Sequence, residues 1–315
     1  MSFAFEIKQE VAQKIMKGKD AIAELSALVQ LSSSISVSAL GMTLVFTTEN
    51  GAVARRIFSL VKDSFTENIE TFVKKKMNLK KNQIYGVRVL DNVPNLLKEV
   101  GLYSNRGLRE IPLAKIVQTD NNARAYLAGA FLASGSVNSP ENSNYHLEIA
   151  TNTIEHGEFI IDLLSRFNIH AKKIKRRNNY IVYVKSAEKI ADFLRIIEAD
   201  QGLLDYEDIR IARDFANQFT RLNNMELAND AKTVDASVKQ RADIKKIKKA
   251  KAFDDLDEKL KDVALLREEF PESSLNELAE EYRRRTGISV SKSGMKHRFN
   301  RIHEIALKLK WLVVE

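Results

Sequence analysis

Apolar residues recur at helical spacing near the start of the chain. Ile22, Leu25 and Val29 fall on one face of a helix that ends near Leu31. Asp20 precedes them and is a residue type that caps helix N-termini. The pattern therefore predicts a helix capped by Asp20.

Alternating apolar and polar positions follow and are typical of half-buried strands. They predict strands at Thr43–Thr48 and Ile84–Leu90. Helices are predicted over 52–65 and 93–100. Pro94 lies near the first turn of the second helix, where proline is tolerated. This region is therefore expected to be an α+β unit.

A second block repeats this order about one hundred residues later. Helices are expected over 122–133, 154–167 and 187–197, and strands over 145–150 and 180–185.

Sliding one block on the other aligns Leu25 with Leu127 and Ser32 with Ser134. The matching element order favours a duplicated unit over a chance resemblance between two α+β units.

After residue 199 the strand signals stop. A helix is expected over 206–222, followed by a polar, mostly helical connector that ends near Ala252. The connector carries a run of basic residues: Lys239, Arg241, Lys245, Lys246, Lys248, Lys249 and Lys251. A solvated helix face is the favoured interpretation of this run, and a phosphate-contacting strip is the alternative.

The C-terminal region has the signals of a helix-turn-helix. Ser274 and Glu277 form a capping box, and Gly287 suits a left-handed C-cap. Ser291 can cap a second, basic helix that ends near Leu309. Two helices joined by a short glycine-containing turn are typical of this DNA-binding motif.

The second helix has a polar face opposite its apolar stripe. We expect four side chains to meet base edges: Ser293, Lys296, His297 and Asn300. Four others are expected to contact phosphates: Ser291, Lys292, Arg298 and Arg301. An ordinary solvated helix on a small bundle is the weaker alternative.

Composition narrows the class of protein. The 315 residues carry a formal net charge of +8, which favours a polyanionic partner. They include no cysteine, and this excludes disulfides and cysteine chemistry. The stretch from Leu25 to Asn50 has no charge before Glu49, but it contains six serines and changes periodicity. We therefore expect a soluble cytoplasmic protein that does not bind membranes.

Residues Leu127–Gly135 (LAGAFLASG) resemble the LAGLIDADG motif of homing endonucleases. The resemblance implies two motif helices packed closely along a pseudo-dyad, with small side chains at Ser26, Ala27, Ala128 and Gly129. Endonucleases of this fold hold divalent metals with an acidic residue at the end of each motif helix. Here Ser32 and Ser134 occupy those positions, and a neutral hydroxyl cannot replace a carboxylate for such cations.

The chain as a whole resembles the WhiA family of bacterial regulators over nearly its full length. The resemblance is strongest at 126–140, 145–151, 224–240 and 290–302. Met225 departs from it where a cysteine is expected, and Ala128 where a larger basic residue is frequent. The resemblance implies a role in cell division and chromosome segregation, or in transcription in sporulating relatives.

The expected fold is α+β: a duplicated LAGLIDADG-type αββαββα pseudo-dimer, followed by an all-α helix-turn-helix domain. The expected divisions are two halves at 1–105 and 106–220, a basic connector at 221–255, and the DNA-binding domain at 256–315.

The predicted function is non-catalytic binding of double-stranded DNA at the nucleoid, with no cofactor, no metal and no catalytic residue. Two alternatives stay open. One is an active endonuclease or RNA maturase, and the other is a sensing lobe for protein partners or ligands that is tethered to DNA.

Overall fold

The computed structural model describes residues 2–38, 41–65, 68–75, 83–105, 107–142 and 144–309. The chain forms two compact units, Met1–Arg213 and Asp214–Glu315. The end of the expected DNA-binding domain, 310–315, lies outside the described residues.

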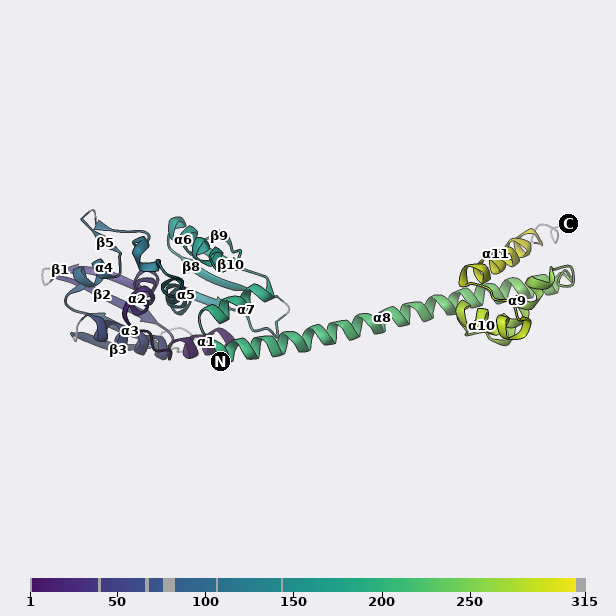
Figure 1. Ribbon diagram of the computed structural model, residues 1–315, viewed down its shortest axis with the longest axis horizontal. Helices are drawn as coiled ribbons and strands as arrows, with labels where there is room; N and C mark the ends of the chain where they lie inside the picture. The colour runs from purple at the N-terminus through teal and green to yellow at the C-terminus, as the bar shows by residue number, and fades with distance from the viewer. Residues whose placement is uncertain are drawn as a thin grey trace. The chain divides into compact units, whose positions relative to one another are not determined.

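The first unit combines helices with two four-stranded antiparallel sheets (Figure 1). Its helices are α1 (Phe3–Val11), α2 (Gly18–Ser32), α3 (Gly51–Ser64), α4 (Val93–Glu99), the 3₁₀ helix η1 (Ala114–Val117), α5 (Asp120–Ser134), α6 (Ile154–Ser165) and α7 (Ala187–Ile196).

The first sheet has the order β1-β2-β4-β3 and the second has the order β7-β8-β10-β9. Their strands are β1 (Ser33–Ser38), β2 (Gly41–Thr48), β3 (Ile69–Lys75), β4 (Gln83–Val89), β7 (Gly135–Val137), β8 (Leu147–Thr151), β9 (Lys172–Arg176) and β10 (Asn179–Val184). A short pair, β5 (Tyr103–Ser104) and β6 (Gly107–Leu108), completes the unit.

The two halves repeat one plan, which confirms the expected α+β duplication. The helices α2 and α5 each span 15 residues, and both end in a serine that leads directly into an edge strand. In each sheet the central strands pair in the same sense, with Leu44 opposite Val89 in the first and Leu147 opposite Val184 in the second.

The motif helices α2 and α5 pack along the middle of the first unit. A Cβ added to Gly129 would lie 2.3 Å from the carbonyl oxygen of Glu24. Ser26, Ala27 and Ala128 are fully buried beside it. The close approach of these two helices therefore depends on small side chains, as the resemblance to the LAGLIDADG motif implied.

The prediction that Asp20 caps α2 was wrong. The helix begins at Gly18, and Lys17 occupies the N-cap position. Asp20 lies in the first turn, where its Oδ1 accepts a hydrogen bond of 2.6 Å from Asn122 Nδ2. Its carboxylate joins the first turns of the two motif helices instead of capping its own helix.

The helix α8 (Asp200–Lys249) spans 50 residues and carries the chain from the first unit into the second. The expected boundary at 220 therefore falls inside a continuous helix.

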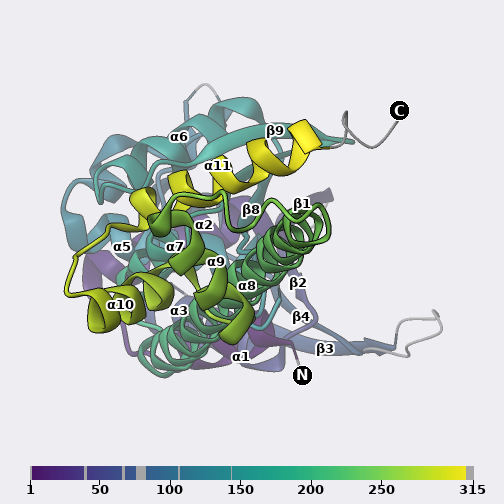
Figure 2. The ribbon, with the colours of Figure 1, turned by 90° about the vertical axis from the view of Figure 1, so that its right-hand side faces the viewer.

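In the part of the chain described up to residue 309, three further helices follow: α9 (Glu258–Glu269), α10 (Leu275–Thr286) and α11 (Lys292–Lys308). Figure 2 shows them beside the C-terminal end of α8.

The second unit has a core of its own. Its buried residues come from all four helices and include Ile244, Val263, Tyr282, Phe299 and Ile302. Because Ile244 belongs to α8, the last turns of that helix are part of the folded C-terminal unit rather than a separate connector. Within the described residues, no helix is long and apolar enough to cross a membrane.

Candidate nucleic-acid interface

The turn between α10 and α11 has the geometry that the sequence predicted. Ser274 and Glu277 form the reciprocal capping box at the start of α10. Gly287 follows α10 with a φ of 74°, in the left-handed region that glycine adopts without strain. Ser291 Oγ then accepts a hydrogen bond of 3.2 Å from the Gly294 amide and caps α11. The predicted caps and turn are confirmed.

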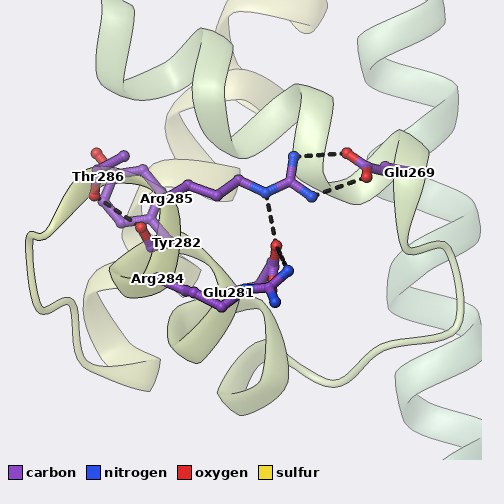
Figure 3. Close-up of polar contacts among 6 residues, drawn as sticks. All are labelled: Glu269, Glu281, Tyr282, Arg284, Arg285 and Thr286. Carbon is purple, nitrogen blue, oxygen red and sulfur yellow. Dashed lines mark hydrogen bonds and ion pairs between the residues drawn. The ribbon is translucent and has the colours of Figure 1, made fainter.

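Arg285 fixes the end of α10 to the end of α9 (Figure 3). Its guanidinium donates two hydrogen bonds to the Glu269 carboxylate, at 2.7 and 2.8 Å, and a third to Glu281 at 2.7 Å. These bonds hold the pKa of Glu269 below its usual range, and bonds from Arg284 and Arg285 lower the pKa of Glu281. The Arg285–Glu269 pair is exposed and contributes little stability, so its main effect is to orient α10 relative to α9.

One side of α11 is buried in the second core through Met295, Phe299, Ile302 and Ala306. Arg298 also lies towards this side. Its guanidinium carbon is 4.6 Å from the centre of the Tyr282 ring, and its Nη1 is buried. In this arrangement Arg298 stacks on α10, so it is less available to a phosphate than the sequence pattern indicated.

The other predicted contact residues lie on the outside of α11. Ser293, Lys296, His297 and Asn300 are all exposed, as are Ser291 and Lys292. Arg301 is 56% exposed and forms an ion pair of 2.8 Å with Glu304. The four residues expected to meet base edges therefore share an open surface.

This surface has two parts. Lys292, Lys296 and Asn300 line a groove of about 1050 Å³ between α11 and α8. Ser293 and His297 lie outside the groove lining, on the more outward part of α11. The sequence pattern places Lys296 and His297 on one surface, and it carries no signal that α8 forms the second wall of the groove.

The groove is also lined by a buried arginine side chain that the sequence did not point to. Arg267 of α9 is 1% exposed, and burial lowers its pKa to about 10. It donates to Gln240 Oε1 at 2.9 Å and to the Ser273 carbonyl at 2.6 Å, and it stacks on Phe299. An arginine four residues before a proline, in a short helix rich in charged residues, gave no sequence signal for this role.

In the first unit, Ser32 and Ser134 end the two motif helices as predicted. Ser32 Oγ donates to the Leu28 carbonyl at 2.6 Å, and Ser134 Oγ donates to the Ala150 carbonyl at 2.7 Å. Both hydroxyls therefore satisfy backbone groups. Within the described ranges, no group of three histidine or acidic side chains is placed to hold a metal ion.

Three family models match successive parts of the chain. The WhiA N-terminal LAGLIDADG-like domain matches residues 18–103, the WhiA LAGLIDADG-like domain matches 123–216, and the WhiA C-terminal HTH domain matches 219–306. The chain belongs to the WhiA family. The HTH match begins within α8, which agrees with a C-terminal unit that includes part of that helix.

Similar proteins cover nearly the whole chain. A probable cell division protein WhiA from Oceanobacillus iheyensis is 43% identical, with 98% of each chain covered. Its namesake from Enterococcus faecalis is 42% identical over 98% of this chain and 99% of that one. The crystal structure of full-length WhiA from Thermatoga maritima matches with a TM-score of 0.60 and 25% identity, over 98% and 99% of the two chains.

Proposed function

We propose that this protein binds double-stranded DNA without cleaving it, and that it acts in cell division as a regulator located at the nucleoid. The observation that carries the proposal is the exposed, basic face of α11 in a helix-turn-helix. The cap at Ser291 and the turn at Gly287 orient this face away from the second core.

Two further observations support the proposal. The relatives with 42–43% identity carry the name of a cell division protein. The hydroxyls of Ser32 and Ser134 replace the carboxylates that a two-metal nuclease requires, and both donate to backbone carbonyls. A role in chromosome segregation or transcription belongs to the same proposal, with the first unit supporting or modulating DNA binding through protein contacts.

In the test, the full-length chain first selects the duplexes that it binds from a random-sequence pool. Its affinity for a selected duplex is then measured by fluorescence anisotropy titration. Lys296→Ala with Asn300→Ala is expected to weaken binding to the selected sequence by about 2–4 kcal/mol, because each base contact contributes roughly 1–3 kcal/mol. Binding to a scrambled duplex should fall much less, since phosphate contacts dominate it.

The matched control removes the same residue types elsewhere in the second unit. Lys259 and Asn276 are exposed outside α11, and Lys259→Ala with Asn276→Ala should leave the preference for the selected sequence unchanged. Equal losses on selected and scrambled duplexes would contradict base reading by α11. Cleavage of either duplex in magnesium buffer would contradict the non-catalytic part of the proposal.

A further inference from the structure

The C-terminal part of α8 presents lysines along one side. Lys232, Lys239 and Lys246 are spaced by seven residues, and all three line the groove opposite α11. Seven residues fall about 20° short of two full helical turns, so the three side chains stay within roughly 40° of one another. Successive lysines are about 10 Å apart along the helix.

The charge of the groove is strongly one-sided. Its lining contains six cations, namely those three lysines with Lys292, Lys296 and Arg267, against the two carboxylates of Asp230 and Asp243. Asp243 is 2.7 Å from His303 Nδ1 and 3.9 Å from Lys246 Nζ, so its carboxylate offsets part of the charge of Lys246. The groove therefore has an excess of positive charge.

Arg267 contributes to this excess from inside the protein. The acceptors of its hydrogen bonds are Gln240 Oε1 and the carbonyls of Phe270, Pro271 and Ser273, all of which are neutral. A buried guanidinium bound to neutral acceptors keeps its full charge in a region where water screens it weakly. An anion in the groove would interact favourably with that charge.

We propose that this groove binds the phosphate backbone of the DNA whose bases α11 contacts, with α8 forming a second phosphate-binding wall. The proposal rests on the proposed function. Lys292, Lys296 and Asn300 connect the groove to the exposed face of α11, so a duplex on that face extends a strand towards the α8 lysines. Neutral donors at Asn229, Thr233 and Gln240 suit phosphate oxygens as well.

The other sides of α8 offer a matched control. Arg241, Lys245 and Lys249 are exposed, lie outside the groove lining, and are rotated by roughly 80–160° from the mean direction of the three groove lysines. Replacing either set by glutamine removes three positive charges from the same helix with little change in helix propensity.

The experiment measures the affinity of the full-length chain for a selected duplex over a range of salt concentrations. Each phosphate contact contributes about 0.9 to the slope of log K against log salt. The variant K232Q/K239Q/K246Q should therefore lower the slope by roughly 2–3 and weaken binding about a hundredfold near 0.1 M salt. The variant R241Q/K245Q/K249Q should change the slope by less than about 1, because its side chains lie outside the groove lining and make no phosphate contact there.

Each outcome decides the inference. An unchanged slope in the groove variant, or equal losses in both variants, would overturn it while leaving DNA binding intact. Absence of DNA binding by the unaltered chain would instead refute the proposed function, and this inference with it. Circular dichroism shows whether both variants keep the helix content of the unaltered chain.

Discussion

His156 and Tyr126 form a buried polar pair in the first unit. His156 Nε2 lies 2.8 Å from the Tyr126 hydroxyl, which also contacts Gln30 Oε1 at 3.2 Å. Burial lowers the pKa of His156 from 6.5 to about 4. This network joins both motif helices to α6.

The folded state should lose stability as the pH falls from 7 to 5. The unfolded chain takes up a proton at His156 near pH 6.5 and the folded chain only near pH 4, so acid favours unfolding between those values. The expected loss from His156 is about 2 kcal/mol. Urea denaturation of the first unit at pH 7 and pH 5 measures it.

The variant His156→Gln is the control, because glutamine can hydrogen-bond to Tyr126 without titrating over this range. Between pH 7 and pH 5, the free energy of unfolding of this variant should fall by roughly 2 kcal/mol less than that of the unaltered chain. An identical change in the variant and the unaltered chain would show that other groups cause the pH dependence.

At the scale of elements, the crossing of α2 and α5 depends on Gly129. The variant Gly129→Ala places a Cβ 2.3 Å from the Glu24 carbonyl oxygen and must separate the two helices. Overpacking of this kind costs about 1–3 kcal/mol, and the gain in helix propensity of about 1 kcal/mol offsets only part of it. We expect a net destabilisation of up to about 2 kcal/mol in urea denaturation monitored by circular dichroism.

Gly157 of α6 provides the comparison, because its added Cβ would meet Thr151 Oγ1 at 3.3 Å and other atoms only beyond 3.6 Å. The variant Gly157→Ala should change stability by less than about 1 kcal/mol, since the helix gains propensity and the contact is mild. If both substitutions had the same effect, the helix crossing would not be the sensitive point.

The elements that the sequence predicted are those with strong local signals. The caps at Ser274 and Ser291 and the apolar stripe of α11 depend on residues close together in the chain. The edge strand β9 has the sequence KKIKR with every residue exposed, so it lacks the alternation that indicates a strand. It forms because β10 supplies hydrogen-bonding partners along its length.

One part of the candidate site could likewise be predicted from local sequence signals, and the other part could not. The exposed face of α11 follows from helical periodicity, whereas its partner wall on α8 depends on how two helices distant in sequence pack. Lys239 belonged to a recognised basic run, but its position opposite Lys296 results from the second core. Arg298 shows the limit of periodicity, because stacking on Tyr282 draws it inwards from the edge of the helix.

At the scale of the whole molecule, the two units have separate hydrophobic cores joined by one helix. Leu28 is fully buried in the first core, and Ile302 is 1% exposed in the second. Because the buried residues of the two cores do not overlap, damage to one should leave the other intact.

The final prediction tests this independence with Leu28→Ala, Ile302→Ala and the double variant. Each single substitution should destabilise its own unit by about 2–5 kcal/mol, as truncation of a buried aliphatic side chain does. Amide hydrogen exchange resolved by segment should show faster exchange in α2 and α5 for the first variant, and in α9 to α11 for the second. The total destabilisation of the double variant should equal the sum of the two single destabilisations within about 0.5 kcal/mol. A larger deviation, or faster exchange in the unaltered core, would show that α8 couples the units energetically, and DNA bound to the second unit would then influence the first through that helix.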